Sequence, residues 1–248
     1  MVLFCLGYPD QASAQSSAAI AEARRLAHPP SVASSLALSA RRLSLGEHSA
    51  ALGEQVDQLL AVTTEQGLPH WRSQGTIFRG WANVKKGDIA EGISLLRSGS
   101  AAYRATGAEV WMPYHLARLA GACEIAGQTE DAATLLDDAV LIVERTGERW
   151  FAAELNRLKG QLMLRQGHSD AAEELYRKAL SIAEEQEAKL WELRASVSLA
   201  RLRRDQGRRA EARNLLAPVY GWFTEGFDTP DLKEAKALLD ELEAARWT

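Results

Sequence analysis

The chain has 248 residues, of which 46% are hydrophobic and 25% are charged, so it has the composition of a folded protein and is not intrinsically disordered. Its 29 basic and 33 acidic residues give a net charge of −4, which argues against a chain that binds nucleic acid or an anionic membrane through its overall charge. Two cysteines, Cys5 and Cys123, are too few for a disulfide framework and indicate the reducing environment of the cytoplasm.

The N-terminal residues contain a short apolar run that begins at Val2. The run is shorter than the core of a signal peptide and no basic residue precedes it, so we expect no signal peptide and no membrane-spanning helix. Too few residues precede Gly7 to form a first helix. We therefore expect an incomplete first repeat over 1–26, in a chain that starts within a solenoid as a fragment or a truncated reading frame. Val2, Leu3 and Phe4 should then face solvent or another chain, which allows self-association.

Glycines recur along the chain at intervals of 39 to 41 residues. The recurring glycines are Gly7, Gly46, Gly87, Gly127, Gly167 and Gly207. Between them the apolar residues follow the i, i+3, i+4, i+7 spacing of amphipathic helices, so each glycine is interpreted as the residue that ends a helix. Each period of about 40 residues therefore predicts a pair of antiparallel helices.

The period also places these helices along the chain. The first helices of the repeats are expected over 31–45, 69–86, 109–126, 149–166 and 189–206. The second helices are expected over 9–26, 48–66, 88–106, 128–146, 168–187 and 208–224. Because one pair cannot bury its apolar face alone, successive pairs should stack into an all-α, right-handed superhelical solenoid.

Two further sets of residues repeat with the same period. Aromatic side chains expected in the core between repeats are Trp71, Trp111, Phe151 and Trp191. Small residues expected where neighbouring helices approach closely are Gly80, Ala120, Gly160 and Ala200.

The last residues predict an end to the array. Thr229 and Pro230 can open a capping helix over 229–246, and Pro218 should loosen the helix before it. The aromatic residues expected to seat this cap are Tyr220, Trp222, Phe223 and Phe227. The whole chain, 1–248, is thus expected to form a single solenoid. Its repeats, between the incomplete first repeat and the capping helix, are 31–66, 69–106, 109–146, 149–187 and 189–224.

One segment, LNRLKGQLMLRQGHSDAAEELYRKALSIAEE, resembles a tetratricopeptide repeat (TPR) through Leu158, Gly160, Ala172, Tyr176 and Ala179. The period exceeds the 34 residues of the usual repeat, so longer helices are expected. The ending RLRRDQGRRAEARNLLAPVYGWFTEGFDTPDLKEAKALLDEL is similar to the C-terminal end of bacterial signalling proteins. Those proteins join a class III nucleotide cyclase, or a DNA-binding effector domain, to a STAND-type ATPase and a TPR-like tail.

The sequence contains no motif that predicts catalysis, so we expect no enzyme, no cofactor and no metal. It has no Walker A motif, no G-x-S-x-G motif and no H-E-x-x-H pair. The histidines occupy unrelated points of the repeat, at His28, His48, His70, His115 and His168. A cluster of arginines predicts a salt-bridged face or an interdomain contact rather than a nucleic-acid site. Its members are Arg201, Arg203, Arg204, Arg208 and Arg209.

The resemblance implies that the first helices line a concave groove, where a partner would bind. The residues that it places there are Gln74, Trp81, Tyr114, Arg118, Glu154, Arg157, Gln161, Arg194 and Arg201. Arginines among aromatic residues suit an acidic or extended peptide. The alternative is that these positions vary only because nothing packs against them.

Three functions are consistent with these features. The leading hypothesis is a non-enzymatic protein-interaction and regulatory module, the tail of a larger cytoplasmic signalling or transcription-regulating protein. Its partner would be a protein, a peptide or an N-terminal domain of the same protein. The alternative is a sensor of a small-molecule effector, and an enzyme with an unrecognised site ranks last.

Overall fold

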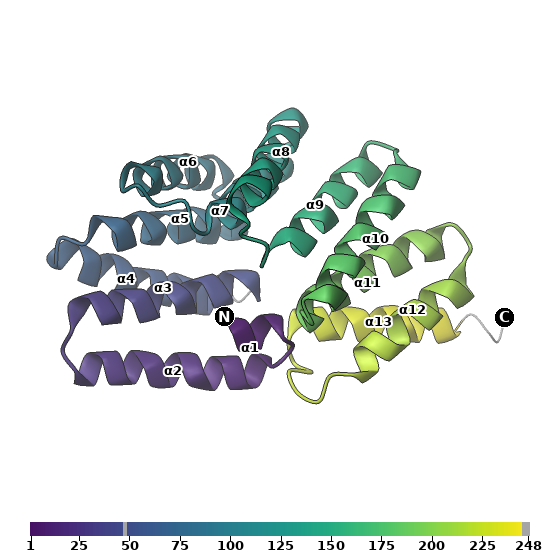
Figure 1. Cartoon of the computed structure of the whole chain (residues 1–248), viewed down its shortest axis with the longest axis horizontal. Helices are drawn as coiled ribbons and strands as arrows, with labels where there is room; N and C mark the ends of the chain where they lie inside the picture. The colour runs from purple at the N-terminus through teal and green to yellow at the C-terminus, as the bar shows by residue number, and fades with distance from the viewer. Residues whose placement is uncertain (47–48, 245–248) are drawn as a thin grey trace. The chain divides into compact units, whose positions relative to one another are not determined.

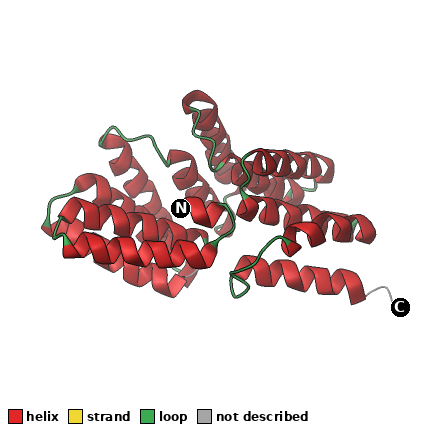
Figure 2. Ribbon diagram, turned by 60° about the horizontal axis from the view of Figure 1, so that its bottom comes forward, coloured by secondary structure: helices red, strands yellow, loops and turns green. Residues whose placement is uncertain are grey.

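The structure is a computed structural model that describes residues 1–46 and 49–244. Within these ranges it contains thirteen α-helices and no strand (Figure 1), and Figure 2 shows them joined by loops. The helices are α1 (Val2–Cys5), α2 (Pro9–Arg25), α3 (Pro29–Leu45), α4 (Ser49–Glu65), α5 (Pro69–Lys86), α6 (Ile89–Ala105), α7 (Met112–Ile125), α8 (Thr129–Thr146), α9 (Ala152–Arg165), α10 (Ser169–Glu185), α11 (Lys189–Asp205), α12 (Arg209–Gly221) and α13 (Pro230–Ala244). The all-α prediction is confirmed.

Several helix ends differ from the predicted ones. Helices α7 and α9 begin three residues later than expected, and Trp111 before α7 takes a left-handed φ of 73°. Helix α12 ends at Gly221, three residues earlier than expected, and contains Pro218 in its last turn, where the proline cannot donate the usual hydrogen bond to the carbonyl of residue 214. His48, which opens the helix expected over 48–66, and residues 245–246 of the capping helix lie outside the described residues.

The turn glycines end helices as predicted. Gly127, with a φ of 77°, donates its N–H to Glu124 O at 3.0 Å, and Gln128 donates to Cys123 O at 2.8 Å. This is a Schellman motif, which needs a left-handed residue at its centre and therefore favours glycine. Gly46 departs from the pattern, because it follows α3 with a φ of −83°.

The described chain packs into two compact units. Unit 1 comprises Met1 and Ser13–Arg145, and unit 2 comprises Val2–Ala12 and Thr146–Thr248. From α3 to α7 in unit 1 and from α9 to α13 in unit 2, each helix packs against its neighbours in the chain. First helices also pack against one another, as α3 does on α5 and α9 on α11. No helix among the described residues is long and apolar enough to span a bilayer.

Helices α5 and α6 make the close approach that the small residues predict. A Cβ on Gly80 would lie 2.7 Å from Gly92 O and 2.8 Å from Leu96 N, and a Cβ on Gly160 would lie 2.6 Å from a ring carbon of Tyr176. These glycines therefore let helices pack backbone to backbone, or backbone to ring.

We expect Gly80→Ala to lower the free energy of unfolding by about 1–3 kcal/mol, because its Cβ would overlap the α6 backbone. Gly121→Ala is the matched control, since its Cβ would meet only Trp81 ring carbons at 3.6 and 3.7 Å. Better helix propensity should leave the control unchanged or more stable by up to about 1 kcal/mol. Urea unfolding followed by far-UV circular dichroism measures both. Equal losses at the two glycines would contradict the packing account.

The core of unit 2 lies where α13 covers α11 and α12. The buried residues of α13 are Leu232, Ala235, Leu238, Leu239 and Leu242, and they pack in one cluster with Leu193, Val197, Ala200, Ala212, Leu216 and Phe223. Pro230 is the first residue of α13, as expected, but Thr229 donates its hydroxyl to Gly226 O at 2.7 Å. The terminal helix therefore covers an apolar surface, as a cap does.

The first residues fold differently from the prediction. Val2 is exposed, but Phe4 is only 3% exposed, within a short helix, α1, that the sequence did not predict. Helix α1 packs against α11. Phe4 is thus buried by its own chain, and the expectation that it faces solvent or another chain is wrong.

Candidate functional site

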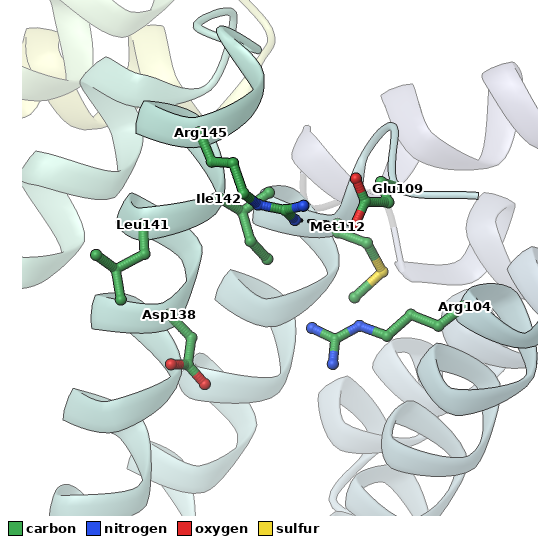
Figure 3. A pocket seen from close by; sticks show the side chains of 7 residues that line it. All are labelled: Arg104, Glu109, Met112, Asp138, Leu141, Ile142 and Arg145. Atoms are coloured by element: carbon green, nitrogen blue, oxygen red, sulfur yellow. Dashed lines mark hydrogen bonds and ion pairs between the residues drawn. The ribbon is translucent and has the colours of Figure 1, made fainter. Parts of the chain in front are cut away.

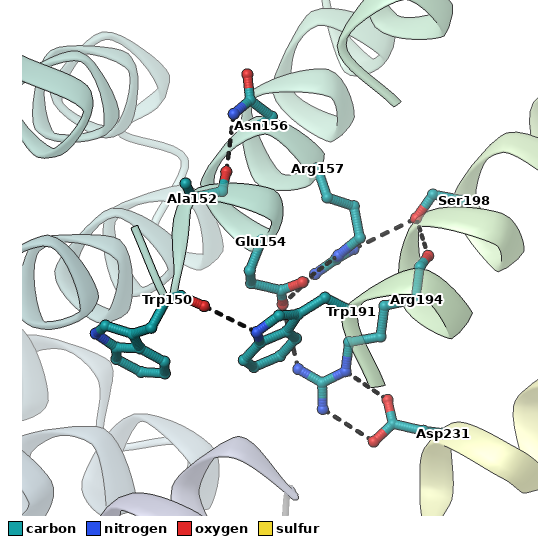
Figure 4. Close-up of polar contacts among 9 residues, drawn as sticks. All are labelled: Trp150, Ala152, Glu154, Asn156, Arg157, Trp191, Arg194, Ser198 and Asp231. Atoms are coloured by element: carbon teal, nitrogen blue, oxygen red, sulfur yellow. Dashed lines mark hydrogen bonds and ion pairs between the residues drawn. The ribbon is translucent and has the colours of Figure 1, made fainter. Parts of the chain in front are cut away.

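Four charged residues of unit 2 form a network that we call the ion cluster, made of Glu154, Arg157, Arg194 and Asp231 (Figure 4). Glu154 in α9 is 1% exposed. Its carboxylate accepts hydrogen bonds from Nε and Nη2 of Arg157 at 2.7 and 2.8 Å, and from Nη1 of Arg194 at 3.2 Å. Three of the predicted groove residues therefore share one buried site.

Asp231, in the first turn of α13, completes the ion cluster. Arg194 donates Nε to Oδ1 of Asp231 at 2.6 Å and Nη2 to Oδ2 at 2.9 Å, which is a bidentate pair. Burial opposes the charge of Arg157, but the Glu154 carboxylate beside it raises the pKa of Arg157 overall. Arg157 therefore keeps its charge, and the hydrogen bonds of the ion cluster tie α13 to α9 and α11.

Aromatic side chains border the ion cluster. Trp191 is 1% exposed, and its Nε1 donates to Trp150 O at 3.0 Å. The ring of Phe151 meets the ring of Trp191 edge to face, with 5.5 Å between the ring centres. The Arg194 guanidinium lies 5.3 Å from the centre of the Trp191 ring. The expected core position is confirmed for Phe151 and Trp191, whereas Trp71 and Trp111 are only half-buried.

Beside the ion cluster, unit 2 holds residues 2–12 of the same chain, which we call the N-terminal segment. Helix α1 packs on α11, and Tyr8 meets Trp222 edge to face at 5.5 Å. A Cβ on Gly7 would lie 2.7 Å from Trp222 and 3.0 Å from Phe223, so the backbone of the segment rests directly on these rings. Trp222 therefore seats the N-terminal segment, whereas Phe223 joins the core under α13.

Glu225 clamps the same segment by capping α2. Its Oε1 accepts the N–H groups of Asp10 at 2.9 Å and Gln11 at 3.1 Å, and its Oε2 accepts the Gln11 side-chain amide at 3.0 Å. In return, Gly226 donates its N–H to Asp10 Oδ2 at 3.1 Å. Desolvation opposes its charge, but these hydrogen bonds lower the pKa of Glu225. A carboxylate distant in sequence thus satisfies N–H groups that a helix start leaves open.

The packing of the N-terminal segment changes the pKa of the Cys5 thiol. Burial raises the pKa of its thiol to about 12, while the N-terminal ammonium and Arg194 act in the opposite direction and Glu154 adds to the rise. The thiol is therefore protonated and unreactive at neutral pH. Helix α1, which contains Cys5, packs against α11, the helix that carries the predicted groove residue Arg194.

The four groove residues predicted in unit 1 are also buried. Gln74 accepts a hydrogen bond from Nη2 of the buried Arg41 at 2.7 Å, and Tyr114 hydrogen-bonds Ser44. The guanidinium of Arg118 lies 4.9 Å from the Trp81 ring centre. Gln74, Trp81, Tyr114 and Arg118 are therefore held by neighbouring side chains, and a ligand would reach them only after these move.

The last two groove residues lie nearer the surface. Gln161 is half-buried, and Arg201 is exposed and pairs with Glu234 of α13. Three other arginines of the predicted cluster also pair with carboxylates, Arg203 and Arg208 with Glu173 and Arg204 with Glu241 at 2.9 Å. Arg209 instead donates to the backbone carbonyl of Glu241 at 2.7 Å. The prediction of a salt-bridged face is confirmed.

A buried histidine in unit 1 had no predicted role. His115 is 0% exposed, and its ring lies 5.1 Å from that of Tyr103 and 5.5 Å from that of Tyr114. Burial, followed by the charges of Arg41 and His70, lowers its pKa well below the usual value. His115 is therefore neutral and acts as a packing residue among aromatic rings.

Unit 1 also contains an open pocket of about 630 Å³ between α6, α7 and α8 (Figure 3). The side chains that line it are Arg104, Glu109, Met112, Asp138, Leu141, Ile142 and Arg145. Arg145 pairs with Glu109 across one edge, with Nη2 at 2.8 Å from Oε1. The pocket thus combines charged groups with an aliphatic wall, and none of its residues was predicted from the sequence.

The comparisons with known proteins agree with this fold. Residues 112–185 match the family model described as tetratricopeptide repeat. Over 201 residues the chain is 29% identical to the uncharacterized protein R02095 of Rhizobium meliloti (strain 1021). The alignment covers 81% of this chain and 20% of that protein. The chain therefore spans about a fifth of the length of this curated relative.

Solved structures share the architecture at low identity. BtubC from P. vanneervenii aligns with a TM-score of 0.58 and 15% identity, over 96% of this chain and 91% of that one. RapI in its apo form gives 0.61 and 13%, over 97% and 68%. A Rap protein complexed with competence and sporulation factor gives 0.60 and 15%, over 86% and 64%. The chain is thus an all-helical array of TPR-like repeats.

Proposed function

We propose that the chain is a non-enzymatic protein-interaction module, the C-terminal tail of a larger cytoplasmic regulator such as a bacterial signalling ATPase or nucleotide cyclase. Stacked TPR-like hairpins offer extended surfaces that suit protein partners. The relative from Rhizobium meliloti supports a larger whole, because this chain matches only 20% of its length. Partner binding at the tail would then control an output domain elsewhere in that protein.

The observation that supports this proposal most is how unit 2 binds the N-terminal segment. It uses the same kinds of contact with which peptide-binding surfaces hold their ligands. Phe4 is a buried apolar anchor, Tyr8 meets Trp222 edge to face, and Glu225 binds backbone N–H groups. Backbone clamps of this kind need no particular side chain, while the aromatic contacts select a sequence. We propose that this surface, with Glu154, Arg157 and Arg194 beside it, also receives partner polypeptides.

Exchange of the segment tests the proposal. In the full chain, Phe4→Ala with Tyr8→Ala should weaken the bound segment while leaving its receptor surface intact. A labelled peptide of residues 1–12, with serine at position 5, should then bind this variant at least tenfold more tightly than it binds the wild-type chain. The reason is that a tethered segment competes at an effective concentration of about millimolar. Fluorescence anisotropy gives both affinities.

The controls separate binding from unfolding. A peptide with alanine at positions 4 and 8 should lose the gain, and circular dichroism should show unchanged helix content in the variant. Iodoacetamide should modify Cys5 faster in the variant, since the thiol pKa returns toward its ordinary value once the segment leaves. Equal affinity of the peptide for both chains, or equal affinity of both peptides for the variant, would contradict the proposal.

A second function, the sensing of a small-molecule effector, is favoured by the pocket of unit 1. Its volume of about 630 Å³ lies within the range of pockets that hold small ligands. The two functions are compatible, because the pocket residues belong to unit 1 and the receptor surface for the N-terminal segment belongs to unit 2.

A further inference from the structure

The pocket of unit 1 holds one cation and one anion that have no partner within the described residues. Arg104 lies in the last turn of α6 and Asp138 lies in α8, and neither side chain makes a hydrogen bond or an ion pair in the part of the chain that the structure describes. Figure 3 shows both side chains reaching toward the same open space. Charged groups that converge on a pocket without pairing are available to a ligand.

The other charges of the pocket neutralise one another. Arg145 and Glu109 form an ion pair at 2.8 Å on its edge. The charge offered to a ligand is therefore one guanidinium from Arg104 and one carboxylate from Asp138. This pattern matches a molecule that carries one carboxylate and one ammonium group, and it disfavours a ligand with net charge of either sign.

The wall between these charges is aliphatic. Met112 is 1% exposed, Ile142 is half-buried, and Leu141 leaves 61% of its surface exposed beside the pocket. Covering an exposed leucine at the rim with an apolar group of a ligand makes the free energy of binding more favourable. The volume of about 630 Å³ is ample for a ligand with two aliphatic side chains.

We infer that this pocket binds a small aliphatic zwitterion, of the class of an aliphatic dipeptide, with its carboxylate on Arg104 and its ammonium on Asp138. The aliphatic side chains rest on Met112, Leu141 and Ile142. This inference rests on the second proposed function and names its ligand class and its residues.

Calorimetric titration of the full chain tests the assignment with leucyl-leucine as the probe. We expect saturable binding that Arg104→Gln and Asp138→Asn each weaken at least tenfold. Dipeptides with one terminus blocked show which residue binds the carboxylate and which binds the ammonium group. The C-terminal amide should bind weakly and equally to the wild type and to Arg104→Gln. The N-acetyl dipeptide should bind weakly and equally to the wild type and to Asp138→Asn.

The matched control is Arg97→Gln, which removes an arginine of the same helix that pairs with Asp131 and does not line the pocket. It should leave the affinity for leucyl-leucine unchanged. Absence of binding at millimolar leucyl-leucine overturns the inference, while partner binding in unit 2 can still be measured by peptide exchange. Binding that Arg104→Gln and Asp138→Asn do not weaken also overturns it, because the probe then occupies another site.

Discussion

Replacing Glu154 by alanine should lower the free energy of unfolding by about 3–5 kcal/mol, because it removes the buried counter-charge shared by two arginines whose side chains are each 12% exposed. Arg157 and Arg194 both donate to the Glu154 carboxylate, which is 1% exposed. Asp231 would then be the remaining carboxylate among the four residues of the ion cluster. The loss should be smaller for Glu154→Gln, since the amide oxygen can still accept one hydrogen bond.

Urea unfolding followed by tryptophan fluorescence measures this loss, because Trp191 packs against Arg194 in the same cluster. Glu174→Ala is the matched control, since Glu174 is an exposed carboxylate on the neighbouring helix α10. It should change stability by less than about 0.5 kcal/mol. A loss below about 1 kcal/mol for Glu154→Ala would show that solvent or nearby groups replace the carboxylate.

The repeat period was sufficient to predict the helices and part of the ion cluster. A stack of similar hairpins brings equivalent positions of successive first helices together, so Glu154 and Arg194, 40 residues apart, meet across α9 and α11. A second register of groove positions, which runs through Trp81, Gln161 and Arg201, contains Arg41 40 residues before Trp81 and could have been extended back to find it. Asp231 could not be found in this way, because α13 lies outside the repeating pattern.

Periodicity failed where distant residues meet. It describes contacts between neighbouring repeats, whereas Glu225 binds Asp10 across 215 positions of the sequence. Phe4 is buried in α1, which packs against the equally distant α11, and its burial was therefore mispredicted. The pocket of unit 1 was not predicted from the sequence for another reason. Its lining depends on side chains of α6 and α8 and the loop before α7, whose charges follow no common period.

Removing residues 229–248 should have the largest effect, with loss of cooperative unfolding in unit 2 and aggregation of the truncated chain. Four leucines of α13 are 2–8% exposed, and each contributes about 1.5–3 kcal/mol by its burial. The truncation would also uncover Leu193, Val197 and Leu216 on α11 and α12. It would deprive Arg194 of its bidentate partner at the same time.

A point substitution in α13 distinguishes the effect of lost packing from the effect of removing the last residues. Leu238→Asp places a charge in the buried face of α13, whereas Ala237→Asp places the same charge one residue away on the exposed face. We expect the first to lower the urea midpoint steeply and to shift the chain toward aggregates in size-exclusion chromatography, because an unpaired charge cannot stay in that core. The second should behave as the wild type. A truncated chain that stays monomeric, with an unchanged midpoint, would rule out α13 as the cap of unit 2.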